Sequence, residues 1–252
     1  MARPTAQSAS SKNHCNANTE RLGLVRGAQP TRSWKPGRVW VARDGIFPKA
    51  PKCLSAYAPF ESSLEALAHL LLSTDSRIHS YVCQPPPLQY WTPNESGGQD
   101  KREYTPDFIA LTRDGNLLVL DAKAARFAKD EKWLKREPYI RAAYKRDHEA
   151  ELVVWTEAEL MAEPRLTNAR TMYRHRFAPA NRNAELAVAT RLERTDQKLS
   201  IGFICDEVSL ELGCEPSEVF GSLMRMALEG WISLGSDRPY DAETLVSSME
   251  IV

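Results

Sequence analysis

The chain has 252 residues, with 33 basic and 33 acidic side chains, 42% hydrophobic residues and 26% charged ones. This length suits one medium domain plus a small one. Five cysteines without a CxxC pair and five histidines without HxxxH spacing favour a reducing compartment and argue against a structural zinc site. No apolar run reaches the roughly 18 residues of a membrane span and no signal-peptide core is present, so we expect a cytoplasmic protein without a membrane partner.

Positive charge is concentrated at the N-terminus. Residues 1–52 contain ten Lys and Arg against two acids, Glu20 and Asp44, a surplus of eight. A basic arm of this kind can bind phosphate, and composition alone equally allows a solubilising tail. We expect residues 1–33 to form a mobile basic arm, because they hold few large apolar side chains, and order to begin near Trp34.

A helix is expected over residues 62–74, where apolar side chains recur three and four residues apart. These side chains are Leu64, Leu67, Ala68, Leu71 and Leu72. Glu65 lies beside this stripe, so its carboxylate can lean toward a sheet that the helix covers. The run from Ser62 to Glu65 also has the pattern of a capping box, in which Glu65 bonds back to the backbone at the helix start. Both roles for Glu65 stay open.

The next stretch is expected to be extended and then irregular. Residues 78–90 predict a strand, and its three prolines confine part of it to an edge or a bulge. The polar, glycine-containing residues 92–103 predict a loop.

Residues 105–112 and 117–123 predict a β-hairpin, because both runs are rich in Ile, Val, Leu and Phe and a turn sequence separates them. Both faces of each strand are apolar apart from Asp107, Asp121 and Lys123. This pattern is typical of central strands that are covered on both sides.

The loop of this hairpin decides where Asp107 points. Strand side chains alternate between faces, so Asp121 and Lys123 share a face. A two-residue turn at Asp114-Gly115 would send Asp107 to the opposite face. A three-residue loop that also includes Arg113, with Gly115 in the left-handed region, pairs Asp107 with Asp121. We prefer this register, which brings two carboxylates together with an ammonium one pleat away.

Charged groups in covered strands are costly unless they are paired or bound to a metal. Two adjacent carboxylates repel unless a cation lies between them, and their oxygens suit Mg²⁺ or Mn²⁺. Lys123 would then orient or deprotonate a water, or stabilise the charge of a phosphate under attack. The competing interpretation is a buried Asp–Lys ion pair, with Asp107 capping the end of its strand.

A basic run follows the hairpin and leads into a helix. The basic residues are Arg126, Lys129, Lys132, Lys135 and Arg136, and the residues expected to face the sheet are Tyr139, Ile140, Ala143 and Tyr144. Basic side chains next to a candidate metal site are candidates for DNA-backbone contacts. Residues 152–156 then predict a parallel strand that the helical crossover reaches.

The C-terminal part predicts a second, smaller domain. Residues 166–197 are expected to be a basic connecting segment. Helices over 200–212 and 217–229, followed by an extended run and a turn, outline a winged helix-turn-helix domain over residues 198–252. Arg225 is the only basic residue of the second helix, so docking of a protein partner competes with DNA binding as the role of this domain.

Pro106-Asp107 followed by Asp121-Ala122-Lys123 resembles the PD-(D/E)xK nuclease signature, and the expected element order resembles the αβββαβ core of that superfamily. More of the chain is similar to the TnsA-type endonuclease subunit of heteromeric, Tn-seven-like bacterial transposases. The matching features are Ser63-Leu64-Glu65, Gln84 before the prolines, Tyr104 to Phe108, Asp121 to Lys123, the basic helix, Val154 to Thr156 and the winged-helix tail. The resemblance covers residues 34–250 and is most specific over 60–156.

This resemblance implies a restriction-endonuclease-like α/β nuclease domain over residues 34–165. Glu65, Asp107 and Asp121 would bind Mg²⁺ or Mn²⁺, and Lys123 would be the catalytic lysine. The enzyme would cut one DNA strand at each end of a mobile element and free its 5′ ends, with an integrase-type transposase subunit and an AAA+ ATPase regulator as partners. Some relatives carry glutamine where Asp121 stands, so this carboxylate is closer to restriction-type nucleases.

Two other functions stay open. A stand-alone restriction or repair nuclease of the same core would read DNA with its own winged helix and cut it unaided. A DNA-binding or adaptor protein without activity ranks behind both, because all four expected positions carry competent residues. The resemblance places the protein in the bacterial cytoplasm, on the nucleoid when it is bound to DNA.

Overall fold

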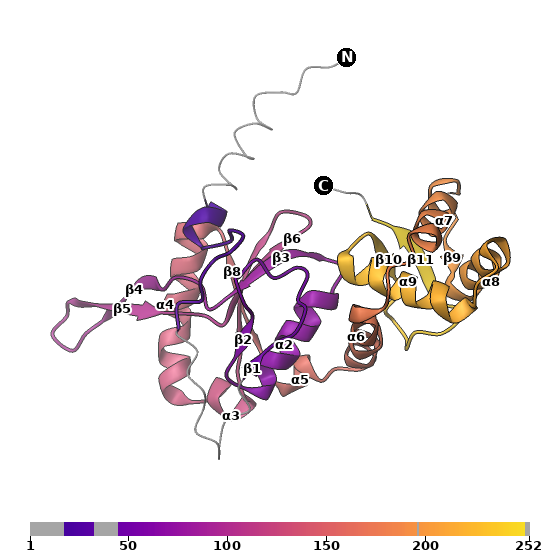
Figure 1. The fold of residues 1–252 in the computed structure, drawn as a ribbon. Coiled ribbons are helices and arrows are strands. Elements are labelled where there is room, and N and C mark those ends of the chain that lie inside the picture. The colour runs from indigo at the N-terminus through magenta and orange to yellow at the C-terminus, as the bar shows by residue number, and fades with distance from the viewer. Residues whose placement is uncertain (1–17, 33–44, 196, 250–252) are drawn as a thin grey trace. The chain divides into compact units, whose positions relative to one another are not determined.

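The computed structural model describes residues 18–32, 45–195 and 197–249, which form a chain of mixed α/β class (Figure 1). The pattern of contacts divides the chain into two compact units. The first comprises Met1–His69 and Arg77–Glu157, and the second comprises Leu70–Ser76 and Ala158–Val252, so far as these ranges are described. The second unit therefore includes the segment that we expected only to connect two domains.

Four strands form the main sheet of the first unit, in the order β3-β6-β7-β8. They are β3 (Ile78–Cys83), β6 (Phe108–Thr112), β7 (Leu117–Ala122) and β8 (Glu151–Trp155). β6 and β7 form the expected antiparallel hairpin and occupy the two central positions. β8 runs parallel to β7 and follows helices α3 (Ala125–Ala128) and α4 (Glu131–His148), which confirms the predicted crossover.

Helices α2 (Ser63–Thr74) and α4 cover opposite faces of this sheet (Figure 1). Strand side chains alternate, so neighbouring residues of β6 face different helices. Phe108 meets His69 of α2 edge to face, with 4.7 Å between the ring centroids. Ile109 belongs instead to the core that includes Ile140 of α4. The sheet is therefore buried on both sides, as its apolar strands predicted.

Helix α4 begins after Asp130, whose carboxylate accepts hydrogen bonds from the backbone N–H groups of Lys132 and Trp133. Its predicted buried residues are Ile140, Ala143 and Tyr144, and all three are buried. Tyr139 was expected among them but is 40% exposed. Tyr139 lies about 100° from the fully buried Ile140 around the helix, at the flank of the buried face, and is therefore only partly covered.

Two small antiparallel sheets accompany the main one. They are formed by β1 (Gly45–Ile46) with β2 (Pro59–Phe60), and by β4 (Leu88–Pro93) with β5 (Gln99–Tyr104). The second sheet corrects the loop that we expected over residues 92–103. Of the β5 side chains only Tyr104 is buried, so this strand lacks the alternation that marks a strand in sequence. Leu88 and Tyr90 of β4 join the core beside α4 and hold the hairpin in place.

Residues 18–32 are an ordered part of the first unit, which differs from the mobile arm expected over residues 1–33. Leu22 and Leu24 are buried in the same core as α4. Burial of these two side chains stabilises a segment whose average composition is polar. The rest of the expected arm, and Trp34 with its neighbours, lie outside the described residues.

The second unit consists of helices and one small sheet. After α5 (Glu157–Leu160) its elements are α6 (Arg165–Arg174), the 3-10 turn η1 (His175–Phe177), α7 (Arg182–Glu193), β9 (Leu199–Ser200), α8 (Ile201–Leu212), α9 (Pro216–Glu229), β10 (Ile232–Leu234) and β11 (Leu245–Ser248). α8 and α9 confirm the two predicted helices. The strands pair in the order β10-β11-β9.

Helix α9 lies at the centre of this unit. Val219, Leu223 and Leu228 are fully buried in one core with residues of α7, α8, β10 and β11. The basic Arg225 forms an ion pair with Glu185 of α7, and these two side chains are 15% and 11% exposed. No helix in the described parts of the chain is both long enough and apolar enough to cross a membrane.

Candidate active site

The β6–β7 loop has the geometry that the preferred register requires. Phe108 pairs with Leu120, which places Asp107 opposite Asp121. The backbone N–H of Thr112 donates to the Asn116 carbonyl at 2.9 Å, and Gly115 has a φ of +85°. A three-residue loop with a left-handed glycine therefore closes the hairpin.

The two carboxylates are held at the end of the sheet by backbone and side-chain contacts. Asp107 Oδ2 accepts a hydrogen bond from the Ala122 N–H at 2.9 Å. Asp121 is 3% exposed, and its Oδ2 lies 3.0 Å from Nζ of Lys123. The Lys123 ammonium also lies 4.3 Å from the centroid of the Trp133 ring, a cation–π contact from α4. Strand and helix together orient all three ionisable groups.

Negative charge accumulates in this buried region. Burial raises the pKa of Asp107 well above its usual range, and the neighbouring charges of Asp121 and then Glu65 add to the effect. Burial, and next the charge of Asp121, likewise raise the pKa of the Tyr104 and Tyr144 hydroxyls, so both remain protonated. Carboxylates that repel one another in a buried place fit the chemistry of a divalent cation site.

Glu65 is engaged at the start of α2. Its Oε2 accepts the Glu61 N–H at 2.8 Å, its Oε1 accepts the Ser62 hydroxyl at 3.1 Å, and its own N–H donates to Ser62 Oγ at 3.1 Å. This arrangement is a capping box in which the Glu65 carboxylate accepts the N–H of Glu61, one residue before the cap residue Ser62. Burial is the main cause that raises the pKa of this carboxyl group. Across the described ranges, no three His, Cys, Asp or Glu side chains are grouped closely enough to hold a metal ion.

The predicted catalytic residues nevertheless all lie around one pocket of about 720 Å³. Glu65, Asp107, Asp121 and Lys123 all line it. Of the five predicted DNA-binding residues, Lys132 and Arg136 line the pocket and the others are exposed beyond its lining: Arg126, Lys129 and Lys135. The basic run is therefore divided between the pocket and the open surface.

Arg32 also lines this pocket and was missed in the sequence. Its Nη1 lies 3.5 Å from Glu61 Oε2 and 3.9 Å from Asp107 Oδ1. No local pattern marks this residue, because its partners follow it by 29 and 75 positions in a polar segment whose course the sequence does not reveal. The surplus of positive charge over residues 1–52 was the one available signal.

Gln84, which the family resemblance singled out, directly follows β3. Its backbone N–H donates to the Asp107 carbonyl at 2.7 Å, and its Nε2 donates to Glu61 Oε1 at 3.3 Å. Gln84 has a φ of +44°, an uncommon value for a residue with a side chain. Gln84 thus supports the backbone that presents Asp107 and is not among the residues that line the pocket.

No protein-family model and no curated protein sequence matches this chain at a significant level. The arrangement of the site is therefore the basis for any functional assignment.

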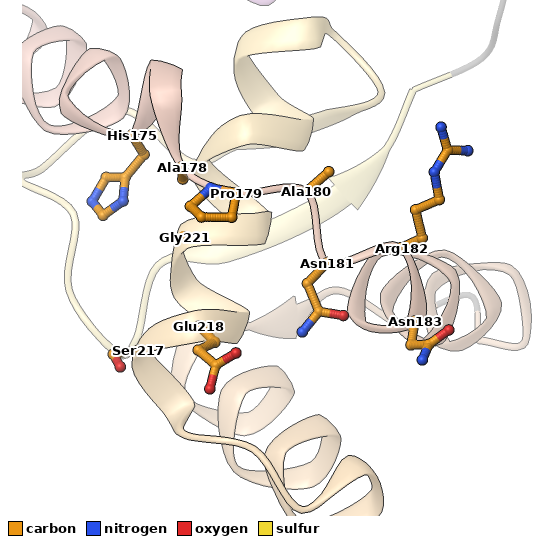
Figure 2. A pocket seen from close by; sticks show the side chains of 10 residues that line it. All are labelled: His175, Ala178, Pro179, Ala180, Asn181, Arg182, Asn183, Ser217, Glu218 and Gly221. Carbon is orange, nitrogen blue, oxygen red and sulfur yellow. The ribbon is translucent and has the colours of Figure 1, made fainter.

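A second pocket, of about 660 Å³, lies on the second unit between the start of α7 and helix α9 (Figure 2). Its one carboxylate belongs to Glu218, which accepts the Glu215 N–H at 3.3 Å as part of the α9 cap. His175 and Arg182 also line it. Because it contains no second acidic side chain, this pocket does not offer the ligands of a divalent cation.

Proposed function

We propose that this protein is a metal-dependent DNA endonuclease that hydrolyses phosphodiester bonds. The observation that carries the proposal is the opposed pair Asp107 and Asp121 with Lys123 bound to it, inside a pocket that basic side chains border. A protein that only binds DNA does not need two buried carboxylates facing the phosphate backbone, because they would repel it.

Asp107 and Asp121 would hold Mg²⁺ or Mn²⁺, and Glu65 would join them on leaving its cap. The bound cation would supply Lewis acidity toward the scissile phosphate and toward a water. Lys123 would position that water and stabilise the negative charge of the phosphate under attack, since Asp121 and Trp133 fix its ammonium. Lys132 and Arg136 would contact the DNA backbone beside the reacting phosphate.

The described part of the chain favours a nuclease that acts with a partner. We propose that the first unit contains the PD-(D/E)xK core and that the C-terminal elements form a winged helix-turn-helix. In that domain α9 would be the recognition helix, yet most of its residues are buried and Arg225 is paired with Glu185. DNA would thus be selected by a partner, which suits the TnsA-type subunit that frees 5′ ends beside an integrase-type transposase and an AAA+ ATPase.

Metal binding and cleavage test this proposal together. We expect the wild type to bind Mn²⁺ in calorimetry and to nick supercoiled DNA in Mg²⁺ or Mn²⁺ but not in EDTA, alone or after addition of an integrase-type transposase. Asp107→Asn and Asp121→Asn should lose both properties. Asp100→Asn, an acidic residue of β5 that pairs with Arg102, is the matched control and should retain them. Mn²⁺ binding that is unchanged in both site variants would refute the proposal.

Cleavage by the purified chain alone, at sites that it selects itself, would instead favour a stand-alone restriction or repair nuclease. Dependence of cleavage on the transposase would support the transposition role.

A further inference from the structure

We propose that Arg32 is a substrate-binding residue of the same site, an inference that rests on the proposed nuclease function. Its guanidinium neutralises Glu61 and Asp107 while no cation is bound. Once a divalent cation takes over that role, Arg32 holds a non-bridging oxygen of the DNA phosphate. Residues 18–32, which do not belong to the main sheet, thus add the guanidinium of Arg32 to the active site.

The main chain before Arg32 is tied to the site. The Thr31 N–H donates to the Gln84 carbonyl at 2.8 Å, and the Thr31 hydroxyl donates to the Pro85 carbonyl at 2.9 Å. Arg32 Nη2 then donates to the Thr105 carbonyl at 3.3 Å, two residues before Asp107. These bonds bring the guanidinium to the Asp107 side of the pocket.

The guanidinium is held loosely by its carboxylate neighbours. Its distances of 3.5 Å to Glu61 and 3.9 Å to Asp107 exceed the 3.0 Å between Lys123 and Asp121. The Arg32 side chain is 42% exposed, whereas that of Lys123 is 20% exposed. Ion pairs that are long and exposed contribute little to stability, so releasing Arg32 from them costs little.

The Arg32 guanidinium suits a DNA phosphate better than it suits the carboxylates of Glu61 and Asp107. A planar guanidinium can donate two parallel hydrogen bonds to phosphate oxygens, which the present long contacts do not use. The Lys123 ammonium is already engaged by Asp121 and Trp133, whereas Arg32 contacts the other carboxylate, Asp107. Arg32 is therefore placed to bind a DNA phosphate beside Asp107.

The test compares Arg32→Ala and Arg32→Lys with Arg102→Ala, a matched exposed arginine of β5 that pairs with Asp100. DNA affinity is measured in Ca²⁺, which takes oxygen ligands as Mg²⁺ does, over a range of salt concentrations, and Mn²⁺ affinity is measured without DNA. We expect Arg32→Ala to weaken DNA binding about tenfold at low salt and to reduce the salt slope by about one. Without DNA, its Mn²⁺ affinity should rise several-fold, because a competing positive charge has been removed.

Arg32→Lys should keep the wild-type salt slope and recover part of the DNA affinity, since it retains the charge without the planar fork. Arg102→Ala should match the wild type in all three measurements. A lower melting temperature of Arg32→Ala with unchanged DNA affinity and salt slope would overturn the inference and leave Arg32 a structural counter-ion. Wild-type protein that binds no Mn²⁺ would refute the nuclease function and this inference together, whereas a competent wild type with an indistinguishable Arg32→Ala variant would refute this inference alone.

Discussion

Lys123 and Asp121 form a salt bridge of 3.0 Å at the C-terminal end of the central strand β7, with the carboxylate almost fully buried and the ammonium beside an aromatic ring. A buried ion pair of this kind is weak support for stability but costly to break from one side. Its presence is therefore easier to explain by chemistry at the site than by folding.

Lys123→Met should lower the free energy of unfolding by about 3 kcal/mol in the absence of metal, because it leaves Asp121 charged and unpaired. The double variant Asp121→Asn with Lys123→Met should recover most of that loss. Urea denaturation in EDTA measures both values. Equal stability of Lys123→Met and the double variant would mean that the unpaired Asp121 is not the cause of the loss.

Glu65 is expected to have two separable roles, one in the cap and one toward the metal. Glu65→Ala should cost about 1 kcal/mol, because the Glu61 N–H and the Ser62 hydroxyl lose their acceptor. Glu65→Gln should keep nearly the full metal-free melting temperature, since an amide oxygen can still accept. Both variants should bind Mn²⁺ more weakly than the wild type. If Glu65→Gln binds Mn²⁺ normally, Glu65 is a cap alone.

Gly115 should be sensitive to substitution through its backbone only. A Cβ at this position would meet nothing within 4 Å, but its φ of +85° is strained for a residue with a side chain. Gly115→Ala should therefore lower the free energy of unfolding by about 1 kcal/mol, and Gly115→Asn by less, as asparagine tolerates this region. Thermal denaturation distinguishes the two, and Mn²⁺ affinity should not change in either.

Deletion of Thr112 tests the register directly. With the loop of residues 113–115 retained, Leu111 would pair with Asn116, which shifts β6 against β7 by one residue and turns Asp107 to the other face. We expect loss of Mn²⁺ binding in a folded protein, judged by circular dichroism. Unchanged Mn²⁺ binding would show that Asp107 and Asp121 need not face each other.

His69 should make stability depend on pH. Its Nε2 lies 3.1 Å from the Pro59 carbonyl, which only accepts, so Nε2 carries the proton and Nδ1 accepts from the Tyr81 hydroxyl at 3.0 Å. Burial lowers the pKa of His69 to about 4. Between that value and the ordinary 6.5 the unfolded chain binds a proton that the folded chain does not. Stability should therefore fall as the pH falls through this window.

The expected loss is at most about 3 kcal/mol from this residue. Urea denaturation at several pH values measures it as the difference between the wild type and His69→Gln, which lacks the titrating group. His79→Gln, at an exposed position of β3, is the control and should follow the wild-type curve. A His69→Gln curve parallel to that of the wild type would contradict the prediction.

The sequence by itself determined the elements whose signals are local. Apolar runs on either side of a turn with Gly115 marked the central hairpin and its register, because strand alternation and the allowed backbone of a loop depend on neighbouring residues. Helical spacing of apolar residues in the same way marked α2. The pairing of Asp107 with Asp121 followed from these rules before any packing was considered.

Only the tertiary structure decided which of several locally allowed roles each polar residue takes. Ser62 to Glu65 allowed both a cap and a ligand, and the structure places Glu65 in the cap. Arg32 reaches Thr105 across 73 positions, and Arg225 is paired with Glu185 inside the second unit. Such contacts depend on how distant segments pack, since the energy of burying or pairing a charge is set by its surroundings in space and not by its neighbours in the chain.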